Sequence, residues 1–292
     1  MRPGIKAAAG RGVVLALGSG GTRGFAHLGV LKTLLDAGLK IDGVCGVSAG
    51  ALFGALYALD GRVESVLEAM TATPFEIAGF YRDRLRLAAS NPLGVRLVAR
   101  FGETRIESLT VPLSILTVDL ETGEEIVLRQ GRLLPAVAAS IAIPVLAQPV
   151  ELDGRRLIDG GYGTAGAAAV ARAMSTGAAN ARSIGASVVV EVDLGVRSRL
   201  PRAFRGLAGG ALARLRAGRA GFARARRAAL GLGALLVGEA VLASSHADLV
   251  ITPALSGVVV HSPFAAAEAF RRGERAATAA LPRLRELLMA PV

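Results

Sequence analysis

The sequence is poor in the side chains that form disulfides or bind metals. Its 292 residues include one cysteine, three histidines and no tryptophan. Because Cys45 stands alone, no intrachain disulfide can form, and a reducing cytoplasm is the simplest compartment to expect. Cys45 lies within an apolar run, so we expect a buried core position instead of a reactive thiol. The histidines are scattered along the chain, so the sequence predicts no metal site and implies no cofactor.

Long uninterrupted hydrophobic runs are missing as well. Although 52% of the residues are apolar, no stretch of about 18 residues lacks charged or polar breaks, which argues against a membrane-spanning helix. The basic start and the apolar run at 12–17 have features of a signal peptide. That run ends in a glycine-rich loop, however, so we predict a first strand there. We expect a cytoplasmic protein with peripheral contact at the inner membrane face.

Most of the formal net charge of +11 comes from one segment. Ten arginines and no lysine or acidic residue lie between Asp193 and Glu239. We predict an arginine-, glycine- and alanine-rich insertion at 197–232 that forms an amphipathic stretch and contacts anionic membrane surface. The arginines expected to make this contact are Arg202, Arg205, Arg214, Arg216 and Arg219. A solvated basic loop is the alternative, and the shortage of aromatic residues argues against specific nucleic-acid binding.

Short aliphatic runs alternate with longer helical patterns along the chain. The runs lie at 12–17, 43–47, 112–119, 187–193 and 248–253. Strands that alternate with helices predict an α/β protein in three layers, α/β/α, with a mainly parallel central sheet. Residues 120–131 have the pattern of a hairpin that turns at Thr122 and Gly123, so one antiparallel pair is expected.

The first predicted strand leads into the glycine-rich turn GSGGTRG at 18–24, and a helix follows. The backbone N–H groups of such a turn and the helix dipole both favour an anion. A dinucleotide pyrophosphate is one candidate, but Arg23 breaks the G-x-G-x-x-G pattern. In addition, Asp42 lies at the start of the second predicted strand, whereas a ribose hydroxyl needs an acid at its end. The other candidate is the transient oxyanion of an attacked ester.

A second glycine motif, GVSAG, joins the second predicted strand to a helix. Gly46 and Gly50 flank Ser48 in a G-x-S-x-G pattern, and such small neighbours permit a strained turn that exposes the serine hydroxyl above a sheet. The alternative is a helix N-cap, because serine is a favoured cap residue. The motif alone leaves both interpretations open.

A nucleophilic serine needs a base, and the position of Ser48 restricts the choice. Only 47 residues precede it, which leaves room for one strand and one helix before the strand that carries it. An α/β-hydrolase places its nucleophile after about five strands, so we do not expect that topology. His27 falls in the first predicted helix, whereas His246 and His261 flank a late strand and keep a Ser-His-Asp triad open.

A carboxylate is the other candidate base. Asp159 ends a short predicted strand and is followed by Gly160 and Gly161. We expect these glycines to form a turn with positive φ that aims the carboxylate at an external group. An ordinary Asp-Gly-Gly turn is the alternative, as at Asp153-Gly154 upstream.

Taken together, these segments resemble the bacterial patatin-like phospholipase family. The resemblance rests on five motifs in the family's order: GSGGTRGFAHLGVL, GVSAGALFGALYA, TVDLETGEEIVLRQG, ASIAIPVLAQPV and LIDGG. It implies a single patatin-like acyl hydrolase domain at 10–292, with the 197–232 insertion inside it. Two departures stand out: Ser19 replaces a glycine that is frequent in the family, and the segment after Gly161 lacks the usual Asn and Pro.

The resemblance also implies a function and a set of site residues. Ser48 would be the nucleophile and Asp159 its base. The implied oxyanion loop consists of Gly20, Gly21, Thr22, Arg23 and Gly24. The expected substrate is a phospholipid or another acyl ester, cleaved through an acyl-serine intermediate without a cofactor. The alternatives are a catalytically weak patatin-like module that binds a lipid surface or a partner, and a Ser-His-Asp esterase.

Overall fold

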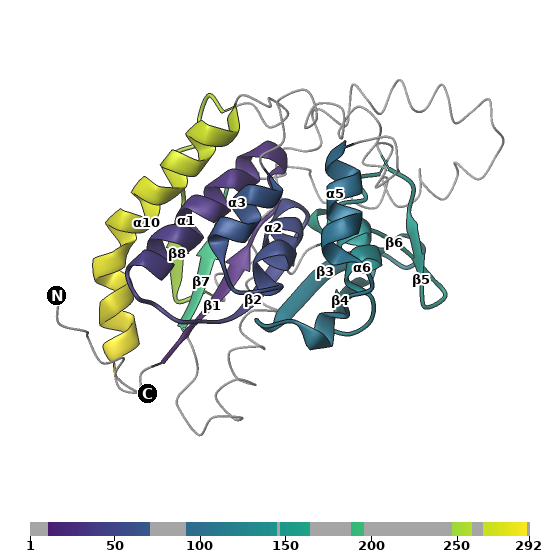
Figure 1. Ribbon diagram of the computed structural model, residues 1–292, viewed down its shortest axis with the longest axis horizontal. Coiled ribbons are helices and arrows are strands. Elements are labelled where there is room, and N and C mark those ends of the chain that lie inside the picture. The colour runs from purple at the N-terminus through teal and green to yellow at the C-terminus, as the bar shows by residue number, and fades with distance from the viewer. Residues whose placement is uncertain are drawn as a thin grey trace.

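An eight-stranded sheet forms the centre of the molecule (Figure 1). The computed structural model describes residues 11–70, 92–144, 147–163, 188–195, 247–258 and 265–290. The strands are β1 (Val13–Leu17), β2 (Ile41–Val47), β3 (Leu113–Asp119), β4 (Glu125–Leu128), β5 (Val150–Leu152), β6 (Arg155–Asp159), β7 (Val188–Val192) and β8 (Leu249–Ile251). The helices are α1 (Phe25–Asp36), α2 (Ala49–Ala58), α3 (Val63–Ala69), α5 (Pro92–Phe101), α6 (Leu133–Ser140) and α10 (Ala266–Met289), with short 3₁₀ turns η1 (Gly21–Gly24), η2 (Ile106–Ser108) and η3 (Gly160–Tyr162).

The sheet is mainly parallel, as the alternation of strand and helix patterns predicts. Its strand order is β5-β6-β3-β2-β1-β7-β8, with β4 paired to β3 off this path. The four pairings that join β3, β2, β1, β7 and β8 are parallel. The predicted hairpin is confirmed, because β3 and β4 pair antiparallel around Gly123, which has φ 74°. Asp153 and Gly154, with φ 50° and 75°, make the predicted turn between β5 and β6.

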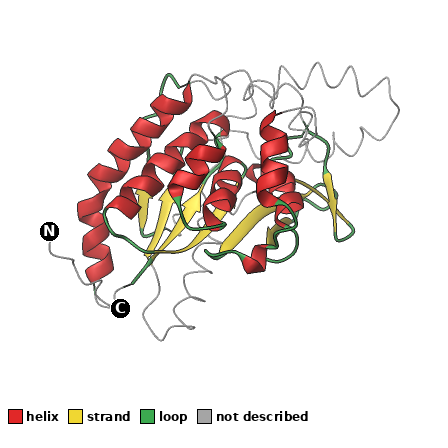
Figure 2. Ribbon diagram, viewed as in Figure 1, coloured by secondary structure: helices red, strands yellow, loops and turns green. Residues whose placement is uncertain are grey.

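Both faces of the central strands β1, β2 and β3 are buried, which places the fold in the predicted layered α/β class. Figure 2 shows α1, α2, α3 and α10 over one face, where alternate β1 side chains such as Leu15 join the main core. On the other face, Val14 and Ala16 join a smaller apolar cluster. Cys45 belongs to that cluster and is fully buried, as predicted, and its burial raises the pKa of the thiol to about 12.

The C-terminal helix α10 crosses α1 at very short range. A Cβ at Gly29 of α1 would collide with the carbonyl oxygen of Phe270, and a Cβ at Gly273 would collide with that of Ala26. Two glycines facing opposite backbones allow the helices to approach more closely than larger residues would. The contact holds α1 in place, and α1 begins directly after the glycine-rich turn.

None of the helices in the described ranges combines the length and apolar character needed to cross a bilayer. The predicted insertion at 197–232 lies outside the described residues, and so do the arginines assigned to membrane contact. The insertion and the extent of the domain at 10–292 remain predictions.

Candidate active site

Ser48 occupies a sharp turn between β2 and α2. Its φ of 55° and ψ of −120° are rare for a residue with a side chain, and such strain is characteristic of functional sites. The residue is at the N-cap position of α2, but its side chain makes no capping hydrogen bond. The glycines on either side are sterically required, because a Cβ at Gly46 would collide with the Gly50 carbonyl and a Cβ at Gly50 with the Leu17 carbonyl. The turn thus has the geometry of a nucleophile elbow.

Strand register brings Asp159 next to Ser48. On one side of β3, Leu116 pairs with Val47, the residue before Ser48. On the other side, Thr117 pairs with Asp159. The Ser48 side chain lies close enough to the Asp159 carboxylate to lower its pKa as a hydrogen-bonding neighbour, and the carboxylate accepts the Gly161 N–H at 2.8 Å. Residues separated by more than 100 positions therefore form one polar pair.

The pKa of the Asp159 carboxylate is shifted towards neutral pH. The residue is 3% exposed, and this burial raises its pKa to about 7 against the opposing effect of the hydrogen bonds from Ser48 and Gly161. Burial has this effect because a low-dielectric environment disfavours the charged form. A carboxylate with such a pKa is a much stronger base than a solvated aspartate.

The glycines after Asp159 act differently from the prediction. Neither Gly160 nor Gly161 has positive φ; they begin the 3₁₀ turn η3. They are needed for close approach instead. A Cβ at Gly160 would collide with the carbonyl oxygen of Leu116, and a Cβ at Gly161 would lie 2.6 Å from Ser19 Oγ and 3.1 Å from Asp159 Oδ1. The expectation of a positive-φ turn was wrong because sequence alone does not show which backbones meet.

The glycine-rich turn presents a row of backbone donors. At its start, Gly18 donates to the Val192 carbonyl, and at its end Arg23 donates to the Gly20 carbonyl at 3.0 Å. Between them, the N–H groups of residues 19–22 have no backbone acceptor among the described residues. Gly21 has φ 52°, a left-handed conformation of the kind that lets successive amides form an anion-binding concavity. Because the amide of Arg23 already donates to the Gly20 carbonyl, not every amide of the predicted loop is free to bind an oxyanion.

Three contacts anchor this turn to the rest of the fold. Arg23 Nε donates to the Val258 carbonyl at 2.8 Å, and Gly24 packs so closely on α2 that a Cβ would collide with Phe53. His27 is fully buried, and its Nε2 lies 2.8 Å from the Gly18 carbonyl, which it contacts as a donor. Burial lowers the pKa of His27 to about 4, so the ring is neutral at physiological pH. With Nε2 occupied, His27 holds the loop and is not placed as a base.

Three further polar residues lie at the site that the motifs did not assign. Ser19 Oγ is buried without a hydrogen-bond partner among the described residues, beside Gly161. Ser140 Oγ contacts the Ser48 amide at 3.0 Å. Tyr162 is 38% exposed, and desolvation together with the charge of Asp159 raises the pKa of its phenol. The ASIAIP and DGGY segments were visible in the sequence, but nothing local to them points to these contacts.

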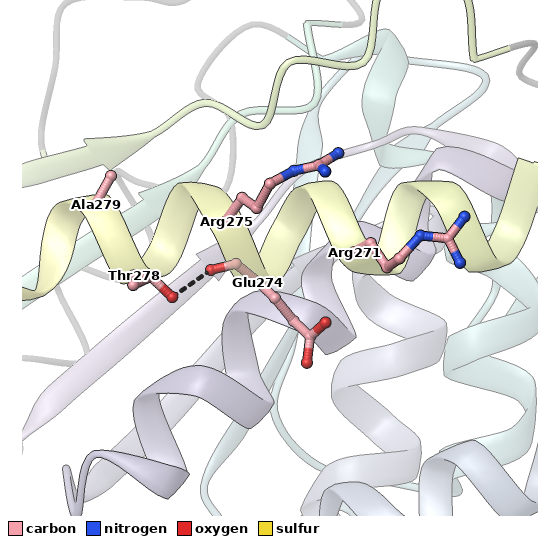
Figure 3. A pocket seen from close by; sticks show the side chains of 5 residues that line it. All are labelled: Arg271, Glu274, Arg275, Thr278 and Ala279. Carbon is pink, nitrogen blue, oxygen red and sulfur yellow. Dashed lines mark hydrogen bonds between the residues drawn. The ribbon is translucent and has the colours of Figure 1, made fainter.

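A recess along α10 does not have comparable chemistry (Figure 3). It is lined by Arg271, Glu274, Arg275, Thr278 and Ala279. Its one hydroxyl, on Thr278, donates to the Glu274 carbonyl one turn earlier at 2.8 Å and has no carboxylate partner in the view. No group of three potential metal ligands occurs in the part of the chain that the structure describes. His246 and His261 lie outside that part.

Comparison with known proteins assigns the chain to a family. The family model described as patatin-like phospholipase matches residues 15–172, which is more than half of the chain. The chain belongs to the patatin-like phospholipase family. The match includes the glycine-rich turn, the Ser48 elbow and Asp159. The predicted family is confirmed.

The curated relatives match about half of the chain. An NTE family protein of Mycobacterium tuberculosis is 37% identical over 159 residues, covering 51% of this chain and 42% of that protein. The neuropathy target esterase sws of Drosophila sechellia is 32% identical over 164 residues, covering 52% of this chain and 11% of that protein. The matched stretch is therefore less than half the length of either relative.

A solved structure supports the patatin-like fold over a longer stretch. VipD from Legionella pneumophila aligns with a TM-score of 0.50 at 13% sequence identity. The alignment covers 94% of this chain and 67% of that chain. At such low identity the likeness concerns the fold alone.

Proposed function

We propose that this family member is a serine lipid-acyl hydrolase with a Ser48–Asp159 dyad. The observation that carries the proposal is the strained elbow that holds Ser48 beside the buried Asp159 carboxylate, whose pKa is raised to about 7. The family match supports lipid-ester hydrolysis as the reaction class. The substrate would be a phospholipid, a lysophospholipid or another carboxylic ester.

In the first step, Ser48 Oγ attacks the ester carbonyl carbon while Asp159 accepts the hydroxyl proton. The carbonyl oxygen becomes an oxyanion, for which we assign the N–H groups of Gly20, Gly21 and Thr22 as donors. The C–O bond to the alcohol then breaks, and the proton on Asp159 passes to the departing alkoxide. The acyl group remains on Ser48. Arg23 and Gly24 anchor the loop in this assignment and are not donors to the oxyanion.

In the second step, water replaces the alcohol. Asp159 accepts a proton from the water as its oxygen attacks the acyl carbon, and the same three amides stabilise the new oxyanion. The bond to Ser48 Oγ breaks, the proton returns to Oγ, and the fatty acid leaves. Each step uses the carboxylate once as base and once as acid, for which a pKa close to neutrality is well suited.

The two other functions considered from sequence receive no specific support. The triad would require His246 or His261, which are outside the described residues, and Asp159 already contacts Ser48 directly. A purely lipid-binding module would not need a strained serine paired to a buried carboxylate. We retain peripheral contact of the arginine-rich segment with anionic lipid as part of the proposal, which supplies a route to the substrate surface.

A fluorophosphonate probe tests the proposed function directly. Such a probe reacts with an activated serine hydroxyl and mimics the tetrahedral stage of acyl transfer. We expect stoichiometric labelling of the wild-type protein, mapped by mass spectrometry to Ser48, and no labelling of Ser48→Ala. Ser114→Ala is a matched control, because Ser114 is also buried but lies on β3 away from the elbow, and it should label normally. Labelling that persists in Ser48→Ala would contradict the proposal.

The pKa of Asp159 predicts opposite effects of pH on activity and stability. The base must be ionised, so kcat/KM on a soluble acyl ester should rise with pH and level off above about 7. The folded-state pKa is raised from the ordinary 3.8, so the folded protein binds this proton more tightly than the unfolded chain. The contribution of Asp159 to the free energy of unfolding should therefore be fully present below pH 3.8. It should be lost as pH rises through about 7.

The two effects are measured separately. The pH profile of kcat/KM is recorded on the wild-type protein, and the free energy of unfolding is recorded from pH 4 to 8 for wild type and Asp159→Asn. The wild-type value should fall relative to the variant across this window, because asparagine has no charge to bury. An activity profile with its midpoint near 4, or parallel stability curves, would show that Asp159 is not the tuned base.

A further inference from the structure

Ser140 is a buried serine that the proposed chemistry does not use. It is the last residue of α6 and is fully inaccessible to solvent. Its Oγ accepts the backbone N–H of Ser48 at 3.0 Å and donates to the Leu116 carbonyl at 2.8 Å. One hydroxyl thus links the elbow, the end of β3 and the end of α6.

The position of this hydroxyl is explained by the β2–β3 ladder. Val44 N–H donates to the Pro112 carbonyl at 2.9 Å, and Val44 pairs with Leu113 in parallel register. In a parallel ladder this bond repeats every second residue. If the pattern continued from Val44 through Gly46, the N–H of Ser48 would donate to the Leu116 carbonyl. Instead, the Ser140 hydroxyl lies between the two groups and bonds to both. It is inserted into the last rung of the ladder.

An inserted hydroxyl separates the two strands where β2 must leave the sheet. Ser48 can then take its φ of 55° while its amide remains satisfied. This matters because an unpaired buried amide costs about 1–3 kcal/mol, and a strained residue persists only where its surroundings fix it. Ser140 therefore supplies the acceptor that the strained turn needs.

The same segment also holds the other member of the dyad. Two residues after Ser140, the Ala142 carbonyl accepts the N–H of Asp159 at 3.0 Å. The backbones of Ser48 and Asp159 are thus both attached to residues 140–142 at the end of α6. Movement of this short segment would change the distance between nucleophile and base.

We propose that Ser140 is a positioning residue for acyl transfer, whose inserted hydroxyl sets the placement of Ser48 relative to Asp159. This proposal rests on the proposed function. It differs from a packing role, because its effect passes through the Ser48 amide to the reacting oxygen. Misplacement of a reacting group by about 1 Å can lower a rate by about 10²-fold.

The test compares Ser140→Ala with the matched control Ser114→Ala. Ser114 is also a buried serine, and its Oγ accepts a hydrogen bond from Arg129 on the neighbouring hairpin at 3.2 Å. For Ser140→Ala we expect kcat and the rate of fluorophosphonate labelling to fall about 10- to 100-fold, with KM unchanged within about twofold. For Ser114→Ala both rates should remain near wild type. Ser140→Cys, which is close in shape but a weak hydrogen-bonding group, should give an intermediate loss and covers the case in which alanine prevents folding.

Hydrogen exchange at the elbow peptide gives a readout that does not depend on activity. Ser140→Ala should speed exchange of the Ser48 amide, whereas Ser114→Ala should not. A wild-type protein without hydrolysis or labelling would reject the proposed function and with it a role of Ser140 in acyl transfer, whereas faster elbow exchange in Ser140→Ala would then show only that Ser140 holds the Ser48 amide. An active wild type with unchanged rates in Ser140→Ala and Ser140→Cys, or with unchanged elbow exchange, would overturn the positioning role.

Discussion

Ser48→Ala and Asp159→Asn are each expected to lower kcat on a short acyl ester by about 10⁴-fold, because members of one catalytic unit cannot act alone. Alanine removes the attacking oxygen. Asparagine keeps the shape of the side chain but has no basic site to accept the proton from Ser48. Initial rates at saturating ester measure both effects, and thermal unfolding should show that both variants remain folded.

Variants of the two remaining histidines distinguish the dyad from a Ser-His-Asp triad. If His246 or His261 were the base, His246→Ala or His261→Ala would abolish activity, and Asp159→Asn would retain a substantial part of it. If the dyad operates, both histidine variants should keep kcat within a few-fold of wild type. A double variant of Ser48→Ala and Asp159→Asn should be no less active than either single variant, since the residues function as one unit.

Gly21→Val should lower kcat by about 10²- to 10³-fold, because the valine displaces amides that we assign to the oxyanion. Gly21 has φ 52°, a conformation that valine rarely adopts, so some loss of stability accompanies the loss of turnover. The measurement pairs kcat with the free energy of unfolding.

Gly123→Val separates the two effects of the Gly21 substitution. Gly123 has φ 74° in the β3–β4 turn and has no atoms within 4 Å of a Cβ position. Valine there introduces similar backbone strain without approaching the site, so stability should fall and kcat should remain near wild type. Equal losses of turnover in both variants would show that the effect of Gly21 passes through stability alone.

The parts of the site that sequence predicted are those encoded within a few residues. The strand, GVSAG turn and helix around Ser48 are contiguous, so the spacing of small and apolar residues was sufficient to predict them. The contact between Ser140 and the Ser48 amide joins residues 92 apart and depends on the β2–β3 register, which no local pattern contains. Gly160 and Gly161 were recognised as necessary, but the reason was the approach of the β3 backbone to Gly160 and of the Ser19 side chain to Gly161.

The close crossing of α1 and α10 means that the boundary of sequence similarity is not the boundary of the folding unit. The family match ends at residue 172, before β7 and α10. A chain shortened to that point would lose β7, the parallel neighbour of β1, and would leave the hydrogen-bonding edge of β1 open to self-association. It would also bare the face of α1 that Gly273 covers. Because the glycine-rich turn lies between β1 and α1, a truncated protein with every proposed catalytic residue present would lack the support on both sides of its oxyanion loop.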